Sequence, residues 1–590
     1  MKRRPFPEEQ HKADFCVIGG GMAGLCAALA AARRGARTVL MHDRPVLGGN
    51  ASSETRVHIS GADRHGQIPF LRETGILEEL RLENLRRNPA RSYSIWDAVL
   101  YDKVRREPNL TLVLNCTCLD ADVEAGRIGS VTGWQLTTQT YQTVRAAIYA
   151  DCSGDGVLAP LSGAEFRMGR EARSEHGESI APEVADARTM GMSCLFMARR
   201  YDSPQPFEPP AWAYRFDSCS DLPYGAEGHR WHEMGYWWIE LGGEADTIRD
   251  TERLRDELLR IVFGVWDHIK NRCSQRADNW ALDWVQFLPA KRESRRYVGL
   301  HVLTQNDIET EGRFEDVVAY GGWTMDDHHP GGFWSARLGH PATTFHPAPS
   351  PYGIPYRVLC SRDIENLMFA GRCASCTHAA MSSTRVMGTC AVMGQAVGTA
   401  AALAVQLGVP PGGMCSHVRR LQQALLADDC YLPWLKRDVP ALTASARLTA
   451  SQGDPEPVRD GVGRPVGGDA HAWTCRPGDC VTYEFGRPGM VREAVLTLDS
   501  ALDRLIAMSH HQADGQLTAV PAVMPRRFRL EGLRDGRWAP LVSVEDNYQR
   551  HVRAPIGRVL EGVRFVLEET WGGTETRLYQ FLIEGEAVQS

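Results

Sequence analysis

The N-terminal pattern alternates short apolar runs with a stretch of small residues. Phe15–Ile18 is a continuous apolar run, typical of a buried parallel strand, and a glycine-rich turn follows it. A helix of small residues is predicted from Leu25 to Arg34, with Gly35 as its C-cap. A second strand is expected over Arg37–Met41. The pattern therefore predicts a strand–turn–helix–strand unit of the α/β class.

The middle of the chain, from about residue 166 to 355, has a different pattern. A helix of mixed character is predicted over Arg249–Lys270. Eight of the fifteen tryptophans fall in this part of the chain: Trp231, Trp237, Trp238, Trp266, Trp280, Trp284, Trp323 and Trp334. They are interpreted either as a packed aromatic core or, for one or two of them, as platforms for the C–H faces of a sugar. We expect an inserted α+β domain here.

After about residue 441, short alternating runs are separated by turn residues. The expected strands are Val481–Phe485, Val491–Leu498, Phe528–Leu530, Leu541–Val544, Gly562–Leu567 and Tyr579–Ile583. Such regular spacing is typical of a β-sandwich. The predicted fold class is an α/β Rossmann-like dinucleotide-binding domain with an inserted α+β substrate domain, followed by an all-β jelly-roll domain. The expected boundaries are 14–165 and 356–440 for the two segments of the dinucleotide-binding domain, 166–355 for the insertion and 441–590 for the sandwich.

Composition narrows the class of protein without changing this architecture. With 43% hydrophobic and 24% charged residues, the 590-residue chain is typical of a soluble globular protein, and its net charge of −7 argues against a nucleic-acid binder. The apolar stretch Gly388–Gly408 contains Gln395 and Gln406, which favours a buried helix over a membrane span. No apolar run follows the basic N-terminus, and the sixteen cysteines form no dense framework. A cytoplasmic protein with reduced thiols is therefore expected.

The turn after the first strand, Gly19-Gly20-Gly21-Met22-Ala23-Gly24, has the G-x-G-x-x-G spacing of dinucleotide-binding proteins. Gly19 permits a tight turn, Gly21 lets the backbone approach a pyrophosphate, and Gly24 allows close packing of helix on strand. The free N–H groups at the start of the helix, beginning with Met22-Ala23, and the positive end of its dipole favour that pyrophosphate.

An acidic residue stands about 20 positions further on, where the second strand ends. Asp43 is expected to hydrogen-bond the adenosine ribose, and the neighbouring His42 can share this role. The alternative is that Asp43 is a solvated acid of the loop.

Two further glycine-containing segments favour a flat cofactor. The loop Leu47–Glu54 combines Gly48-Gly49 with small polar residues, so it can lie against a ring system and donate backbone N–H groups. Near the other end of the domain, a strand at Asn366–Phe369 leads into Gly371-Arg372. Arg385-Val386-Met387-Gly388 then opens a second helix of small residues, whose positive end suits negative charge.

Together these segments resemble a known family, the FAD-dependent oxidoreductases of the glutathione-reductase superfamily that carry a D-R-P-x-L-G-G-N-x-S-S-E signature. This chain reads D-R-P-V-L-G-G-N-A-S-S-E from Asp43 to Glu54, with further matches at 153–156, 169–171, 291–296, 320–328 and 371–385. The resemblance spans about residues 14–440 and implies a flavoprotein with FAD as its cofactor. The expected cofactor-binding residues are Gly19, Gly21, Met22, Ala23, Gly24, Asp43, Arg44, Gly48, Gly49, Asn50, Ser52, Asp155, Gly371, Arg372, Met387 and Gly388.

The resemblance also bears on biological context. Members of the family are often encoded with sugar-degrading enzymes, which implies a role in carbohydrate metabolism. The C-terminal strands, more loosely, resemble galactose-binding-like domains, which bind carbohydrate in some proteins and serve as structural or oligomerisation modules in others.

Missing motifs narrow the class of flavoprotein. No C-x-x-x-x-C pair follows the first turn, so a disulfide reductase of that superfamily is excluded. No second strand–GxGxxG–helix is found, because Gly461–Pro465 is a loop interrupted by proline. A dedicated NAD(P)H domain is therefore not expected, and electrons are expected to enter directly from an organic substrate.

Oxidation of an alcohol by a flavin needs a C–H group aimed at the flavin and a base for the hydroxyl proton. His378 lies just before the late helix and is the first candidate for that base. Arg385 is expected to orient the substrate or to stabilise a developing oxyanion. The alternative is a structural His378, with Arg385 as a clamp for phosphate or carboxylate.

A second group of polar residues competes for the catalytic role. His328 is a rival base, and Asp327, Trp323 and Arg295 are candidate substrate contacts, although an internal ion-pair network is the equal alternative for Arg295. No metal site is expected at Asp326–His329, because adjacent ligands have poor geometry.

Three functions fit these residues. The first is oxidation of a secondary hydroxyl of a sugar or glycoside to a ketone, either as the final product or as a transient step in glycoside cleavage. The second is oxidation or reduction of a C=C bond in an organic acid, which arginines that clamp a carboxylate would favour. The third is a non-catalytic carbohydrate-binding flavoprotein. The expected partners are a small molecule, most naturally a carbohydrate, and an electron acceptor of unknown identity, with no nucleic acid or membrane; a homo-oligomer is left open.

Overall fold

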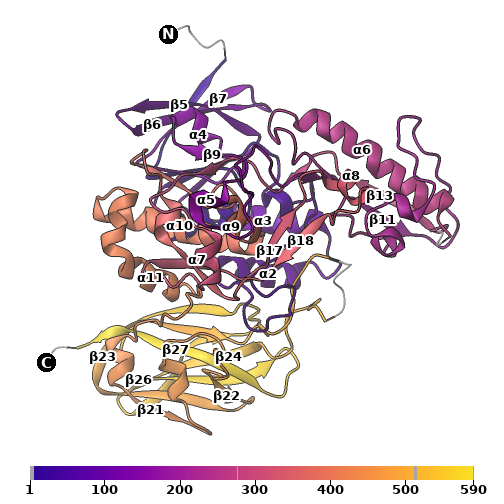
Figure 1. The fold of residues 1–590 in the computed structure, drawn as a ribbon. Helices are drawn as coiled ribbons and strands as arrows, with labels where there is room; N and C mark the ends of the chain where they lie inside the picture. The colour runs from indigo at the N-terminus through magenta and orange to yellow at the C-terminus, as the bar shows by residue number, and fades with distance from the viewer. Residues whose placement is uncertain (1–5, 275–276, 510–514, 589–590) are drawn as a thin grey trace. The chain divides into compact units, whose positions relative to one another are not determined.

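The computed structural model describes residues 6–274, 277–509 and 515–588 (Figure 1). The chain divides into two compact units. The first comprises residues within 1–61, 96–418 and 507–514, and the second comprises residues within 62–95, 419–506 and 515–590. Residues 62–95 thus belong to the second unit, whereas the sequence pattern had grouped them with residues 14–165.

The core of the first unit is a five-stranded sheet with the order β20-β8-β2-β3-β4, in which every pair is parallel. The strands are β2 (Phe15–Ile18), β3 (Thr38–Met41), β4 (Leu110–Val113), β8 (Ile148–Asp151) and β20 (Leu367–Phe369). The residues of β2, β3, β8 and β20 are all buried, as expected of parallel strands covered on both faces. In the register, Ile18 lies beside both Met41 and Asp151, so the carboxyl ends of neighbouring strands are level.

Two helices of small residues pack together on this sheet. They are α1 (Met22–Arg33) and α10 (Met387–Leu407). A Cβ atom on Gly394 or Gly398 of α10 would lie only 2.0 Å from the carbonyl oxygen of Ala23 or Ala27 of α1, respectively. Because these contacts advance along both helices in the same direction, α1 and α10 run parallel, and α10 begins about 10 Å before the level at which α1 starts.

Helix α10 is, among the described residues, the one helix long and apolar enough to cross a membrane by length and composition. Its most apolar 18-residue window is 83% buried inside the protein. The prediction of a buried helix at Gly388–Gly408 is confirmed.

Smaller elements surround this sheet in the first unit. A four-stranded mixed sheet has the order β1-β7-β6-β5. Its strands are β1 (Glu8–Lys12), β5 (Cys116–Glu124), β6 (Arg127–Gln135) and β7 (Thr140–Arg145), and further elements of the same unit are α4 (Leu158–Ser162), η5 (Tyr356–Leu359), α9 (His378–Thr384) and η6 (Pro411–His417). Helix α3 (Tyr93–Arg105) and helix α11 (Val418–Ala427) begin at the boundaries between the two units.

The inserted part of the first unit is built from short strands and helices. Its strands are β9 (Phe166–Arg167), β10 (Met192–Ser193), β11 (Phe196–Arg200), β12 (Glu240–Leu241), β13 (Trp280–Val285), β14 (Ala290–Lys291), β15 (Arg296–Tyr297), β16 (Val317–Gly321), β17 (Met325–His328), β18 (Thr343–His346) and β19 (Tyr352–Pro355). Its helices are α5 (Arg173–His176), η2 (Cys219–Asp221), η3 (Gly225–His229), α6 (Thr251–Asp267), α7 (Gln305–Glu309) and α8 (Gly332–Arg337), and α6 continues into a π-helical turn, η4 (His268–Arg272). The helix predicted over Arg249–Lys270 is therefore present as α6 and most of η4.

The aromatic residues of the insertion divide into two groups. Trp238 and Trp266 are buried in a hydrophobic core together with the apolar face of α6, as the packed-core interpretation predicts. Trp231 and Trp237 are exposed. The packed-core interpretation therefore accounts for only some of these tryptophans.

The second unit contains a seven-stranded antiparallel sheet with the path β22-β27-β23-β26-β24-β25, on which β21 pairs with β23 (Figure 1). The strands are β21 (Arg447–Ala450), β22 (Trp473–Cys475), β23 (Cys480–Leu498), β24 (Pro525–Arg534), β25 (Arg537–Val544), β26 (His551–Thr570) and β27 (Thr576–Ala587), with helices α2 (Ile76–Arg87), η7 (Glu456–Arg459) and α12 (Ala441–Ser445). The runs Val481–Phe485 and Val491–Leu498, predicted as two strands, are one strand, β23, whose pairing shifts register between Glu484 and Gly489. Both halves contribute side chains to one hydrophobic core, as in a β-sandwich.

A buried arginine stabilises the second unit, and its contribution to the free energy of unfolding can be measured. Arg550, with 2% of its side chain exposed, pairs with Asp429 at 3.0 Å and donates to the carbonyl oxygens of Leu498 and Gly463. We expect Arg550→Met to lower the free energy of unfolding by about 3–5 kcal/mol, because the Asp429 carboxylate is left buried without its partner. Urea denaturation of the full-length protein measures this change.

The matched control is Arg553→Met. Arg553 is 43% exposed and pairs with Glu493 near the start of β26. This variant should cost at most about 1 kcal/mol, because exposed ion pairs contribute little. Equal losses of stability in the two variants would contradict the role assigned to Arg550.

Candidate active site

The residues predicted to bind a dinucleotide lie after the carboxyl ends of the parallel strands. The glycine turn follows β2, His42-Asp43 follows β3, Ser153–Gly156 follows β8, and Gly371-Arg372 follows β20. Strand β2 is linked through α1 to β3 on one side, and β8 pairs on its other side. Ligands of open α/β sheets bind at such a switch point, at the carboxyl edge.

The turn itself has the geometry that the three glycines predict. Gly19 has a φ of +99°, and a Cβ atom on Gly24 would lie 1.8 Å from the carbonyl oxygen of Gly19. By contrast, a Cβ on Gly21 would meet only the Cα of Gly49, at 3.9 Å. Helix α1 is capped by Gly21, which has no side chain to accept its first N–H groups. The turn therefore leaves space and hydrogen-bond donors for a pyrophosphate.

The loop Gly48–Ser52 lies directly against this turn. The Gly48 amide donates to the Gly20 carbonyl at 2.9 Å, and Gly21 forms an isolated bridge with Gly48. Gly48 and Gly49 have φ values of +106° and +58°, which favour glycine. Three predicted residues of the loop have partners within the protein: Asn50 donates to the Lys291 carbonyl, Ser52 Oγ accepts from the Glu54 amide, and Arg44 pairs with Glu54 at 2.6 Å.

The structure distinguishes between the two residues after β3. His42 Nδ1 accepts from the Gly20 amide at 3.0 Å, and His42 Nε2 lies 3.0 Å from the Val46 carbonyl oxygen, to which it can donate. Nδ1 thus holds the glycine turn, and Nε2 holds the segment that leads into the Gly48-Gly49 loop. Asp43 has an exposed side chain at the same edge and keeps the role predicted for the ribose.

Asp155, after β8, is held in a cluster of cations. Its carboxylate contacts Lys291 Nζ at 2.6 Å, Ser294 Oγ at 2.9 Å and Arg372 Nη2 at 3.4 Å. Burial alone would raise the pKa of Asp155, but the charges of Arg372 and Lys291 outweigh burial and lower it. Arg372 Nη1 is buried and has no hydrogen-bond partner among the described residues, so it remains available to a ligand.

The first turn of α10, where Met387 and Gly388 are predicted to bind the cofactor, is only partly free of internal partners. Val386 caps the helix and offers no side-chain acceptor, so the first turn is open. The Gly388 amide, however, donates to the Ser60 carbonyl at 2.8 Å. Met387 precedes it at the first helical position.

The candidate catalytic residues gather around the hairpin of β17 and β18. Because side chains alternate along a strand, Asp327 points to one face of β17, and Asp326 and His328 point to the other. Helix α9 packs against β17 and ends immediately before Arg385. The hairpin therefore brings together His378, Arg385, His328 and Asp327, four of the residues singled out in the sequence.

On one face, His378 lies between two carboxylates. Its Nδ1 is 2.8 Å from Glu293 Oε2, and its Nε2 is 3.2 Å from Asp327 Oδ1. Burial alone would lower the pKa of His378, but the negative charge of Glu293 and the hydrogen bond to Asp327 outweigh burial and raise it to about 10. The imidazole is therefore protonated at neutral pH and donates to both acids.

The row formed by Glu293, His378 and Asp327 is held in place by further buried charges. Glu293 also pairs with Arg296, which binds Glu171 at 2.6 Å, and Glu171 accepts from the His378 amide at 2.8 Å. Burial alone would raise the pKa of Asp327, but the hydrogen bond and charge of His378 lower it. Asp327 is the most accessible member of the row, with 24% of its side chain exposed.

On the other face of β17, Arg385 and His328 belong to a second cluster. Arg385 Nη2 contacts Asp326 Oδ2 at 3.2 Å, and its Nε is buried without a hydrogen-bond partner in the described part of the chain. His328 Nδ1 lies 2.6 Å from Glu240, which also pairs with Arg292 at 3.3 Å. The guanidinium groups of Arg385 and Arg292 in this cluster can orient a polar ligand.

Aromatic side chains surround this second cluster. Trp237 is exposed and meets the His328 ring edge-on, with 5.7 Å between the ring centroids. Tyr224 is also exposed, and the centroid of its ring lies 5.8 Å from that of the Trp237 ring. Trp323 Nε1 lies 3.5 Å from Asp326 Oδ2. Charged groups beside partly open aromatic rings can hold a ligand that has both hydroxyl groups and apolar faces.

One predicted substrate residue lies elsewhere. Arg295 donates to the Asp155 carbonyl at 3.2 Å and covers the Phe166 ring at 5.4 Å, so it shares no partner with Arg385. Sequence reasoning missed Glu240 and Arg292, named Trp237 only as one of eight tryptophans in the insertion, and did not assign Glu293 to His378. In the sequence, only the chemical type of these residues could have indicated that they belong to the site, because their partners lie far away along the chain.

The parallel sheet and the glycine turn at its carboxyl edge define a dinucleotide-binding protein. A family model described as FAD dependent oxidoreductase matches residues 14–425. The match covers most of the chain, so the protein belongs to this family and is an enzyme that uses FAD. The predicted cofactor and enzyme class are confirmed.

Solved structures show fainter likenesses. A geranylgeranyl bacteriochlorophyll reductase-like protein from Thermoplasma acidophilum is 14% identical over 71% of this chain and 86% of that one, with a TM-score of 0.31. The family 32 carbohydrate-binding module of Streptococcus pneumoniae EndoD is 16% identical over 25% of this chain and 96% of its own, with a TM-score of 0.19. These scores are below 0.5, so no functional inference is drawn from them. No curated protein matches the chain.

Proposed function

We propose that the enzyme oxidises a secondary hydroxyl group of a sugar or glycoside to a ketone. The observation that carries this proposal is the Glu293–His378–Asp327 row, which ends in a partly exposed carboxylate beside the β17–β18 hairpin. When bound, FAD supplies the acceptor for the hydride that leaves the carbon atom. The chain's own residues must then bind the alcohol and take up its hydroxyl proton.

The proton is assigned to Asp327. A protonated His378 has no lone pair to offer at neutral pH, since its pKa is raised to about 10. Asp327 is ionised, reaches solvent, and is held in place by the hydrogen bond from His378 Nε2. Proton uptake by Asp327 Oδ leaves the carbonyl product, and His378 acts as its positioning residue.

The second cluster supports a carbohydrate as the substrate class. It lies across β17 from Asp327, so it can bind a part of the glycoside away from the reacting hydroxyl group. Trp237, Tyr224 and Trp323 offer rings for the C–H faces of a sugar, and the guanidinium groups of Arg385 and Arg292 lie nearby to bind its oxygen atoms. A ketone formed in a sugar ring also acidifies the neighbouring C–H bond, so the same site suits transient oxidation during glycoside cleavage.

The C=C hypothesis draws less support. It needs arginines that converge on a substrate carboxylate, and Arg295 and Arg385 were the candidates. Arg385 pairs with Asp326, whereas Arg295 contacts the Asp155 carbonyl and Phe166. They do not form a shared clamp in this structure.

The test is anaerobic mixing of the purified, FAD-loaded enzyme with a panel of glycosides and, separately, with saturated organic acids. Loss of the flavin absorbance with a glycoside, together with a ketone in the product, supports the proposal. Bleaching by the acids and by none of the sugars would overturn it in favour of C=C chemistry.

The pH dependence of flavin reduction distinguishes between the two proton acceptors. If Asp327 accepts the proton, the rate should be nearly constant from about pH 6 to 9 and fall in acid, where a carboxylate of lowered pKa is protonated. If His378 accepts it, only the neutral imidazole is active, so the rate should rise about tenfold per pH unit and level off near pH 10. Stopped-flow measurement of the reduction step decides, and a rising profile would transfer the proton to His378.

A further inference from the structure

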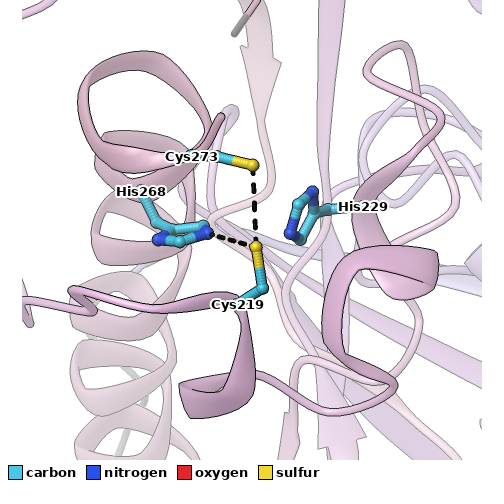
Figure 2. A group of neighbouring side chains, drawn as sticks. All are labelled: Cys219, His229, His268 and Cys273. Atoms are coloured by element: carbon cyan, nitrogen blue, oxygen red, sulfur yellow. Dashed lines mark hydrogen bonds between the residues drawn. The ribbon is translucent and has the colours of Figure 1, made fainter. Parts of the chain in front are cut away.

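Four potential metal ligands converge in the inserted part of the first unit, apart from the ionic clusters of the candidate active site. They are Cys219, His229, His268 and Cys273, and the ligand atom that each one offers lies within 4.8 Å of the other three. Figure 2 shows the Cys219 sulfur between the other three side chains. His229 lies on the side of this sulfur opposite to His268. Two cysteines and two histidines form a set that zinc prefers.

Two of the distances between these ligand atoms are close to the edges of a tetrahedral zinc site. Cys219 Sγ lies 3.7 Å from Cys273 Sγ and 3.4 Å from His268 Nε2 (Figure 2). With Zn–S bonds of about 2.3 Å and Zn–N bonds of about 2.0–2.1 Å, the edges of a tetrahedral site are about 3.8 Å between sulfurs and about 3.6 Å between sulfur and nitrogen. Cys219 thus lies at nearly the distances from Cys273 and His268 that a shared zinc ion requires, and His229 lies within 4.8 Å of all three ligand atoms.

The second, independent observation is the state of His229. This side chain is fully buried, and among the described residues neither of its ring nitrogens has a hydrogen-bond partner. Buried polar atoms normally have a partner, and an imidazole with two orphaned nitrogens calls for one. A cation at the centre of the group would satisfy the nitrogen that faces Cys219.

His268 is already oriented as a ligand. Its Nδ1 lies 3.0 Å from the Phe216 carbonyl oxygen, to which it can donate, so the lone pair of Nε2 points toward Cys219. Histidines that ligate metals commonly donate their other ring N–H in this way. The hydrogen bond to Phe216 thus selects the His268 tautomer that carries its proton on Nδ1 and its lone pair on Nε2.

The backbone brings the ligands together from separate elements. His268 begins the π-helical turn η4 that ends α6, and the Cys273 amide donates to the His268 carbonyl at 2.8 Å. Cys219 opens η2, which is fixed by a capping box at Ser218, and His229 ends η3. Such π-helical turns are rare and occur frequently at functional sites.

We propose that Cys219, His229, His268 and Cys273 bind one zinc ion as a closed structural site. Binding releases the two thiol protons, so that the ion and two thiolates are together neutral. Four protein ligands leave no open position for a substrate, so the site joins the 216–229 segment to the end of α6 and takes no part in the redox reaction. This proposal is independent of the one made for the active site.

The alternative chemistry is a disulfide between Cys219 and Cys273, whose sulfurs face each other. The two cases differ in metal content and in thiol count. Thiol titration of the denatured protein without reductant should find all sixteen cysteines reduced if the site holds zinc, and two fewer if the pair is oxidised.

The experiment uses the full-length, FAD-loaded protein, purified without chelators. Elemental analysis should find about one zinc per chain, and X-ray absorption at the zinc edge should give a mixed shell of sulfur near 2.3 Å and nitrogen near 2.0–2.1 Å. After zinc is removed, one equivalent of Co²⁺ should produce the visible bands of tetrahedral cobalt with thiolate ligands. A protein without zinc that also fails to bind added Zn²⁺ or Co²⁺, or one with the two cysteines oxidised, would overturn the proposal.

Matched variants locate the ion. Cys273→Ser and His229→Asn should each lower zinc affinity by more than about tenfold, because each removes a ligand. Cys194→Ala and His232→Asn alter a buried cysteine and a histidine of the same insertion and should retain full zinc. If the ligand variants do not fold, the cobalt spectrum and thiol count of the unmodified protein still decide. Because none of these measurements uses substrate, failure of the proposed oxidation leaves the result unaffected.

Discussion

Replacing Gly24 with alanine is expected to abolish FAD binding. The added methyl carbon would lie 1.8 Å from the Gly19 carbonyl oxygen and 3.0 Å from Cys152 Cβ, so the backbone of the turn must move. A clash with buried backbone is among the changes that cost about 4 kcal/mol or more. Cofactor content, measured as the ratio of flavin to protein absorbance after purification, should fall to near zero.

Gly21→Ala separates folding from cofactor binding. The protein has room for this methyl group, because the nearest atom is the Gly49 Cα at 3.9 Å. The variant should therefore fold with near-normal stability and yet bind FAD weakly, since the methyl occupies the space left for the pyrophosphate. Normal FAD content in both variants would show that the cofactor does not use this turn.

The second large effect is expected at Asp327. Asp327→Asn should slow flavin reduction by substrate about 10²- to 10⁴-fold, the usual contribution of a general base, while FAD content stays unchanged. His378→Ala should also keep FAD and lose flavin reduction, because Asp327 then loses the hydrogen bond that positions it. Single-turnover stopped-flow absorbance measures both rates.

The control for the hairpin is Thr344→Ala. Thr344 pairs with Asp327 across the hairpin, and its side chain is exposed, so the substitution perturbs the same strands without altering the row of charges. It should react at close to the normal rate. If Asp327→Asn keeps its activity and His328→Asn does not, the base is His328, on the other face of β17.

Local features of the fold could be predicted from the sequence. The β2 strand and the glycine turn depend on neighbouring residues, and the predicted run Phe15–Ile18 coincides with β2. The continuity of β23 from Cys480 to Leu498 could not be foreseen in the same way. Turn residues were expected between Phe485 and Val491, but pairing with β26 continues on either side of residues 485–488, so tertiary contacts outweigh the local signal.

The partners of the candidate catalytic residues could not be predicted from the sequence. His378 was identified by its position before the late helix, but its partners Glu293 and Asp327 are 85 and 51 residues away in the chain. Their charges make it a cation, which its sequence context does not indicate. The cluster of Cys219, His229, His268 and Cys273 was missed for a similar reason, because no short motif joins ligands from three separate elements.

The parallel sheet has a consequence for the order of events during synthesis. Phe369 of β20 pairs with Asp151 of β8, which lies 218 positions earlier, and α10, which covers α1, follows still later. The glycine turn is synthesised well before its sheet and helix partners, the last of which ends at Leu407. Long-range parallel pairing is intrinsically slow and leaves strand edges exposed meanwhile. The nascent enzyme must therefore remain without a completed nucleotide-binding domain while residues 25–407 are synthesised, and its unpaired strand edges are exposed to aggregation during this interval.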